Sequence, residues 1–202
     1  MLIFWQARLA ILAVPKTGTT ALAHVLGPRA DLAAHEPSHA KHTTLARFDQ
    51  FVRPLLGDDR GREVETLAVV REPLSWLSSW YRYRLRDDLV GRPSSARGVG
   101  FDAFVEEWCR RRPAPFAAMG TQGAYVFDAD GQRAVTHLFR HDRPGPLLDF
   151  LRERLGDFPE PPRVNVSAPL ELALAPRTLD LARRRRPDLF RVWREAGGED
   201  DP

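Results

Sequence analysis

The chain has 202 residues, 43% of them hydrophobic and 28% charged, a composition typical of a soluble globular domain. Its single cysteine, Cys109, excludes an internal disulfide and a cysteine-based zinc site. The 30 basic side chains exceed the 27 acidic ones by three, which favours anionic ligands only mildly. Of the 30, 28 are arginines, and the two lysines are Lys16 and Lys41. Arginine is a planar fork and lysine a compact point charge, so the places that keep a lysine are of interest.

The N-terminal segment 1–15 is apolar and reads as buried sheet. It is shorter than the ~20 residues that span a bilayer, and it lacks the basic region and cleavage site of a signal peptide. We therefore expect a cytoplasmic protein with no membrane span. The basic runs Arg110–Arg112 and Arg183–Arg186 fall on predicted helices and read as solvated faces, so no nucleic-acid partner is expected.

The first half of the chain begins with an apolar run, Leu9–Val14, which is typical of a parallel strand buried on both faces. A short turn leads to a predicted helix, Thr19–Leu26, which ends at Gly27-Pro28. The segment 31–42 reads as a polar loop, and 43–56 has helical spacing. A second buried strand is predicted at Thr66–Val70.

After the second strand, Arg71-Glu72-Pro73 opens a predicted helix that runs to about residue 86. A loop of turn residues over 87–100 is followed by a helix over 101–111 and a β-hairpin over 122–140. Three further helices are predicted at 146–155, 176–186 and 188–196, after a proline-rich connection that contains Asn165-Val166-Ser167. The repeated strand–turn–helix units predict an α/β fold, a single domain over residues 1–196 with a central parallel sheet flanked by helices. We expect residues 197–202 to be a disordered tail.

The segment Lys16-Thr17-Gly18-Thr19-Thr20 lies between the first strand and the first helix. The N–H groups at a helix N-terminus are unsatisfied, and together with the helix dipole they form an anion site. Gly18 permits a tight turn, the threonines add hydroxyl donors and Lys16 adds a mobile charge. This pattern predicts phosphate binding, with a threonine-capped helix start as the structural alternative.

The turn does not fit the nucleoside-triphosphate motif G-x-x-x-x-G-K-[ST]. Lys16 precedes Gly18, position 13 is alanine and position 19 is threonine. The second strand ends in Arg71-Glu72 rather than in an aspartate that could hold Mg²⁺. These features disfavour a nucleoside triphosphatase.

A second anion site is predicted after the second strand. Arg71 stands where the strand ends, and Ser79 lies two turns into the following helix, so a guanidinium and a hydroxyl could converge on one phosphate. A structural ion pair is the alternative for Arg71. We interpret Trp76 and Trp80 as core residues.

Together the two segments resemble those of sulfotransferases that use 3′-phosphoadenosine 5′-phosphosulfate as donor. The first matches a PKxGTT turn over Lys16, Thr17, Gly18, Thr19 and Thr20. The second matches R-[DN]-P-x-x-R-x-x-S-x-Y at Arg71, Pro73, Ser79 and Tyr81, with Glu72 and Trp76 as departures. The stretch 122–165 also resembles small bacterial members, but a C-terminal R-x-G-x-x-G loop is not found in the sequence.

The resemblance implies a P-loop NTPase-like sulfotransferase fold and a sulfotransferase of the EC 2.8.2 type. It implies in-line transfer of a sulfuryl group to a hydroxyl or amine, without a metal, on a small-molecule or carbohydrate acceptor. Lys16 would stabilise charge on the leaving phosphate, and Thr17–Thr20, Arg71 and Ser79 would hold the donor. The acceptor and the oligomeric state are not specified by the sequence.

A general base is expected from a histidine or a carboxylate. Three histidines and a glutamate cluster in the segment after the first helix, and we favour His42, then His39, with Glu36 as the carboxylate alternative. A zinc site and a polar surface loop are other readings of this cluster, which also contains His35. Two further functions stay open: a P-loop kinase that uses ATP and Mg²⁺, and a non-catalytic nucleotide- or polyanion-binding protein of the same fold.

Overall fold

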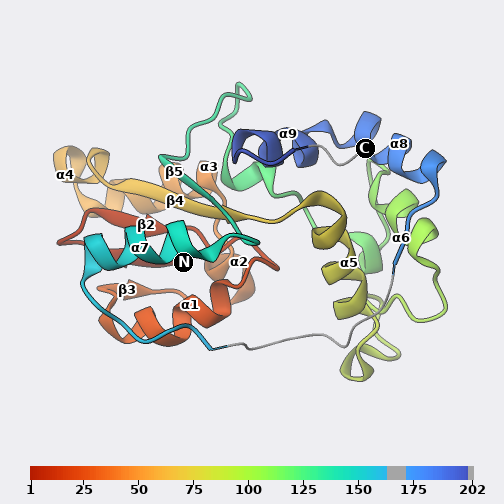
Figure 1. The fold of residues 1–202 in the computed structure, drawn as a ribbon, viewed down its shortest axis with the longest axis horizontal. Coiled ribbons are helices and arrows are strands. Elements are labelled where there is room, and N and C mark those ends of the chain that lie inside the picture. The colour runs from red at the N-terminus through yellow and green to blue at the C-terminus, as the bar shows by residue number, and fades with distance from the viewer. Residues whose placement is uncertain (163–171, 200–202) are drawn as a thin grey trace.

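A mixed β-sheet organises the larger part of the computed structural model, which describes residues 1–162 and 172–199. Within these residues, the sheet has five strands in the order β3-β1-β2-β4-β5 (Figure 1). Their bounds are Leu2–Phe4 for β1, Leu9–Ile11 for β2, Leu32–Ala33 for β3, Glu65–Val70 for β4 and His137–Arg140 for β5.

The predicted parallel arrangement is confirmed for the two predicted buried strands, β2 and β4. β2 pairs with β4 and β4 pairs with β5 in parallel, whereas β1 is antiparallel to both β2 and β3. The connection from β1 to β2 spans only residues 5–8, and so short a link allows only an antiparallel pair. The sheet is therefore parallel on one side of β2 and antiparallel on the other.

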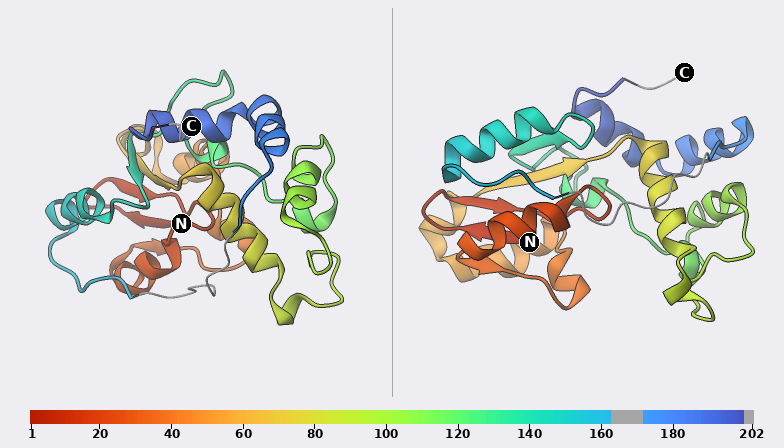
Figure 2. Two further views of the ribbon diagram at one scale, coloured as in Figure 1. Left: turned by 45° about the vertical axis from the view of Figure 1, so that its right-hand side comes forward. Right: turned by 60° about the horizontal axis from the view of Figure 1, so that its bottom comes forward.

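Helices cover both faces of the sheet, because alternate strand residues point to opposite sides. Leu9, Ile11 and Leu67 pack on one face with α1 (Thr19–Leu26) and α7 (Pro144–Leu155). Ala10, Leu12 and Val70 pack on the other face with α3 (Leu45–Arg47) and α9 (Pro187–Glu195). Figure 2 shows this layering from two further sides.

A third hydrophobic cluster lies beyond the carboxyl end of β4. It joins α5 (Pro73–Arg84), α6 (Phe101–Trp108) and α8 (Pro176–Arg185) around the aromatic rings of Trp76, Phe104 and Trp108. Trp76 is 1% exposed, which confirms its predicted place in the core, and Trp80 is partly buried against the same cluster. This helical group stands beside the sheet in Figure 1.

The predicted β-hairpin over 122–140 is wrong. Residues 123–125 form a 3₁₀ turn, and a single isolated bridge joins Phe127 to Arg133 in the described part of the chain. Strand β5 pairs instead with β4 along its whole length. The unpaired backbone edge of β4 offers more hydrogen bonds to β5 than a short local hairpin would.

Other boundaries also differ from the predictions. Helix α1 matches its predicted span residue for residue, but the predicted helix over 43–56 changes from α-helix at Leu45–Arg47 to π-helix and then 3₁₀-helix. The predicted loop over 31–42 contains β3 and α2 (Ser38–Lys41), and a short α4 (Asp58–Arg62) precedes β4. The Asn165-Val166-Ser167 segment and positions 200–202 of the predicted tail lie outside the described residues. No described helix combines the length and apolarity needed to cross a bilayer.

Candidate functional site

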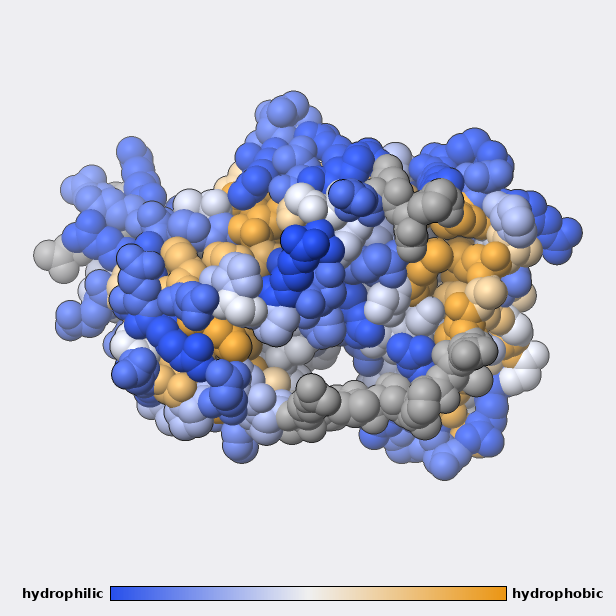
Figure 3. Space-filling model, viewed as in Figure 1, coloured by the Kyte–Doolittle hydropathy of each residue, from blue (hydrophilic) through white to orange (hydrophobic). Residues whose placement is uncertain are grey.

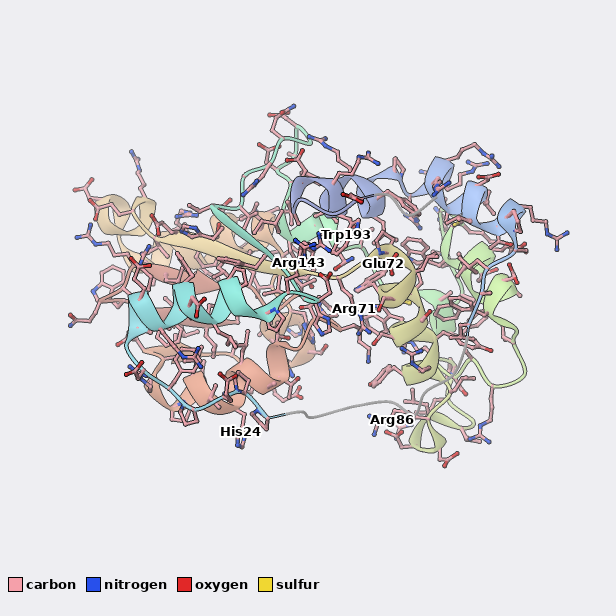
Figure 4. All side chains as sticks on the ribbon, viewed as in Figure 1. His24, Arg71, Glu72, Arg86, Arg143 and Trp193 are labelled. Atoms are coloured by element: carbon pink, nitrogen blue, oxygen red, sulfur yellow. The ribbon has the colours of Figure 1, made fainter. Side chains whose placement is uncertain are left out.

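Three polar segments meet at the carboxyl edge of the parallel strands. The turn 14–20 follows β2, Arg71 follows β4, and His141 follows β5. In Figure 4, Arg71 and Glu72 lie between the sheet and α5, and Figure 3 shows the surface hollowed at this place in the same view. Ligands of open α/β sheets bind at this edge, so the three segments define the candidate site.

The turn after β2 is built by hydrogen bonds to its carbonyl groups. The Val14 carbonyl accepts from the Thr17 hydroxyl at 2.9 Å and from the Thr19 hydroxyl at 3.5 Å. The Pro15 carbonyl accepts from Trp76 Nε1 at 3.0 Å. Thr17 and Thr19 are therefore buried supports of the turn, rather than the free hydroxyl donors that the sequence suggested.

The backbone N–H groups at positions 16–20 of the same turn have no hydrogen-bond acceptor in the described part of the protein. Lys16 and Gly18 adopt left-handed φ angles of 69° and 79°, which turn the backbone so that successive N–H groups converge. In the described residues, the N–H groups of positions 16–20 donate to no protein acceptor. A run of unpaired N–H groups ahead of α1 has the chemistry of an oxyanion site.

The Lys16 ammonium extends from this turn to α5. Its Nζ lies 4.1 Å from the centre of the Tyr83 ring and 5.5 Å from that of Trp80. Burial, followed by the charges of Arg71 and of the arginines at and just after the end of α5, lowers the pKa of Lys16 from 10.5 to about 8. An anion in the site would reverse this effect, because it favours the charged form.

Arg71 is held at the site by polar contacts that the sequence did not reveal. Its Nε donates to the Ser75 hydroxyl at 2.7 Å, and its NH1 donates to the Lys16 carbonyl at 3.3 Å. The side chain of Gln122, which is fully buried, accepts from the Arg71 N–H and donates to the Arg71 carbonyl, both at 2.8 Å. Arg71 thus ties the turn after β2 to the start of α5.

Ser79 and Glu72 have different surroundings. Ser79 is buried on α5, one turn beyond Ser75. Ser75, rather than Ser79, accepts the hydrogen bond from Arg71 Nε. Glu72 is the N-cap of α5, and its two carboxylate oxygens accept from the N–H groups of Leu74 and Ser75. Glu72 therefore performs the capping role that an aspartate or asparagine has at other helix starts.

His42 is the member of the histidine cluster that reaches the site. Its Nδ1 lies 2.6 Å from the carbonyl oxygen of Ala13, next to the turn. A carbonyl only accepts, so Nδ1 carries the proton and Nε2 keeps its lone pair. Burial is the main cause that lowers the pKa of His42, and the bond to Ala13 opposes it. His39 and Glu36 are exposed.

Lys41, the second lysine, also reaches the turn. Its Nζ lies 3.5 Å from the hydroxyl of Thr20, on the exposed start of α1. Both lysines of the chain thus lie at the same turn, Lys16 within it and Lys41 beside it. In the described residues, no group of three or more His, Cys, Asp or Glu side chains is placed to hold a metal ion.

His141 is a further neighbour that the sequence gave no reason to choose. A Cβ atom at Gly18 would lie 3.7 Å from Cδ2 and 3.8 Å from Nε2 of the His141 ring. Burial, and then the charge of Arg71, lower the pKa of His141, while Asp142 opposes this effect. The imidazole therefore borders the anion turn in its neutral form at pH 7.

The site thus offers unpaired N–H groups, two lysines, one arginine and a neutral histidine with a free nitrogen. Such a set can bind one or two oxyanions and accept a proton from a neighbouring hydroxyl. No family model, curated protein or solved structure matches this chain.

Proposed function

We propose that the protein is a sulfotransferase with a P-loop-like sulfotransferase fold, which moves a sulfuryl group from 3′-phosphoadenosine 5′-phosphosulfate to a hydroxyl or amine. The observation that carries this proposal is the link between two anion-binding elements. The NH1 of Arg71, at the end of β4, donates to the carbonyl of Lys16 in the unpaired N–H turn after β2. Two such elements side by side suit a donor with phosphate at both its 3′ and 5′ positions.

The proposed roles follow from the position of each group. The N–H groups of residues 16–20 bind the 5′-phosphosulfate, and Arg71 with Ser75 or Ser79 binds the 3′-phosphate. The acceptor oxygen forms a bond to sulfur as the bond from sulfur to the 5′-phosphate oxygen breaks. The acceptor proton passes to His42 Nε2, and the ammonium of Lys16 stabilises the charge on the leaving oxygen.

The kinase alternative is weakened by the role of Glu72. A carboxylate at the end of the strand next to the phosphate turn would be the place to bind Mg²⁺ in a P-loop kinase. Here both oxygens of Glu72 accept backbone N–H groups of α5, which leaves it committed to the helix. The chain also has its lysine before the glycine of the turn rather than after it.

The experiment that tests the proposal supplies the protein with the sulfate donor and a mixture of small-molecule and carbohydrate acceptors. We expect sulfated products, together with release of adenosine 3′,5′-bisphosphate in equal amount, in buffer that contains EDTA. In a parallel reaction that contains ATP and Mg²⁺ in place of the sulfate donor and EDTA, phosphorylated products and ADP would identify a kinase instead. Tight bisphosphate binding without any transfer would identify the non-catalytic alternative.

A further inference from the structure

Cations and aromatic rings gather around the last turns of α5, next to the proposed donor site. We call it the α5 cluster, and it consists of Lys16, Trp80, Tyr83, Arg84 and Arg86. The rings of Trp80 and Tyr83 meet edge to face at 5.8 Å between centroids. The guanidinium of Arg84 lies 5.2 Å from the Trp80 ring, and that of Arg86 lies 5.5 Å from the Tyr83 ring.

The cluster carries more positive charge than its described surroundings neutralise. Arg86 pairs with Asp88 at 2.9 Å. Within residues 1–162 and 172–199, Lys16 and Arg84 form no ion pair with a carboxylate. Like charges that share a partly buried site repel each other, and a bound anion relieves that repulsion.

Two buried hydrogen-bond donors of the cluster also lack an acceptor. In the described residues, neither Trp80 Nε1 nor Arg84 Nε has a hydrogen-bond partner. The guanidinium of Arg84 does donate one hydrogen bond, a long one from its NH2 to the carbonyl of Ala118 at 3.4 Å. Buried polar groups in native proteins are almost always paired, so unpaired donors beside uncompensated cations indicate a missing acceptor group.

The arginines of the cluster lie at the opposite end of α5 from Arg71. Arg84 is the last residue of α5, and Pro73, next to the Arg71 end, is the first. At a rise of about 1.5 Å per residue, the two ends of this helix are ~16 Å apart. Lys16 connects the two regions, since its backbone lies in the phosphate turn and its ammonium lies on Tyr83.

We propose that the α5 cluster is the subsite for an anionic group of the acceptor, so that the acceptor carries a carboxylate, phosphate or sulfate beside its reactive hydroxyl or amine. This inference rests on the proposed sulfotransferase function. The cations of the cluster attract the anion, and Trp80 Nε1 and Arg84 Nε donate to it. Both nitrogens are shielded from solvent, so binding requires a neighbouring side chain to shift. The proposed moving side chain is that of Lys16, whose ammonium lies over the rings of Trp80 and Tyr83.

The test uses two probes that differ in charge but not in shape, 4-hydroxybenzoate and 4-hydroxybenzamide. Each is titrated by calorimetry into the protein with and without saturating adenosine 3′,5′-bisphosphate. The variants are Arg84→Gln, Trp80→Phe and, as matched control, Arg133→Gln, an exposed arginine on the loop before β5. Bisphosphate affinity is measured in each variant as the check on folding and on the donor site.

We expect wild type and Arg133→Gln to bind the carboxylate at least about tenfold more tightly than the amide, a difference of ~1.4 kcal/mol. Arg84→Gln should lose this preference and keep its bisphosphate affinity, and Trp80→Phe should weaken carboxylate binding alone. Equal binding of both probes to wild type, or an unchanged preference in Arg84→Gln, would overturn the inference. So would a loss of bisphosphate affinity in folded Arg84→Gln, which would place Arg84 in the donor site. Failure of wild type to bind the bisphosphate would instead reject the proposed function. In that case the preference for the carboxylate over the amide, measured without bisphosphate, still tests whether the α5 cluster binds an anion.

Discussion

Replacing Lys16 by methionine is expected to stabilise the folded protein at neutral pH and to abolish its proposed function. Burial and the neighbouring arginines lower the pKa of Lys16 from 10.5 to about 8, so the folded protein holds this charge at a cost. Methionine has a similar length and flexibility but no charge. The same substitution removes the ammonium that, in the proposed mechanism, stabilises the leaving phosphate.

The size of the effect follows from the pKa difference. A fall from 10.5 to about 8 corresponds to ~3 kcal/mol, at about 1.4 kcal/mol for each pH unit. Lys16 is only partly buried, so solvent screening reduces this figure, and methionine also loses the cation–π contact with Tyr83, worth ~0.5–1 kcal/mol at partly exposed sites. We expect Lys16→Met to raise the free energy of unfolding at pH 7 by ~1–2 kcal/mol.

The stabilisation by Lys16→Met depends on pH. Between pH 8 and 10.5 the unfolded chain keeps a proton that folded wild type has released, so wild-type stability rises with pH in this window. The gain from Lys16→Met is therefore largest below pH 8 and shrinks towards pH 10. Urea unfolding at pH 7 and pH 10 measures it. Lys41→Met is the matched control, because that ammonium lies by the Thr20 hydroxyl rather than among arginines. A Lys16→Met protein less stable than wild type at pH 7, or an advantage that does not shrink at pH 10, would refute the reasoning.

Three further substitutions test other parts of the site. Gly18→Ala forces a non-glycine residue to a φ of 79°. We expect a loss of ~1 kcal/mol in stability, measured by urea unfolding, and weaker bisphosphate binding, measured by calorimetry. Unchanged affinity would argue against phosphate binding by the turn. Gln122→Leu leaves the N–H and carbonyl of Arg71 without partners, and urea unfolding should show a loss of at least ~2 kcal/mol; a smaller loss would mean that other groups replace it. His42→Asn should slow sulfuryl transfer at least about tenfold. Because burial lowers the pKa of His42, the wild-type rate should fall at a lower pH than it would with an unperturbed histidine as base; full activity in His42→Asn would remove His42 from the mechanism.

The sequence predicts the parts of the site that depend on local signals. The apolar run, the glycine-containing turn and the helix Thr19–Leu26 are specified by neighbouring residues. The structure reproduces the turn and the helix, and places β2 at Leu9–Ile11, the first half of the predicted strand. The position of Arg71 at the end of a buried strand is likewise local. Three parallel strands then bring these segments to one edge, as the predicted fold class requires.

The contacts that the sequence did not reveal are made between distant segments. Gln122 is 51 positions from Arg71, and nothing in its local pattern indicates that its amide is buried against a strand end. His141 faces Gly18 only because β5 joins the parallel sheet, and the predicted hairpin placed β5 in another pairing. Thr17 and Thr19 show the opposite error, since their spacing suited an anion but their hydroxyls are used by the Val14 carbonyl.

The central claim is that the turn after β2 and Arg71 hold the two phosphates of one nucleotide. Calorimetry in EDTA with adenosine 3′,5′-bisphosphate and adenosine 5′-monophosphate, on wild type, Arg71→Ala and the control Arg133→Ala, tests it most directly. We predict that wild type and the control bind the bisphosphate at least about tenfold more tightly than the monophosphate, and that Arg71→Ala binds both equally. Equal affinities in wild type, or no binding of the bisphosphate at millimolar concentration by folded protein, would contradict the account.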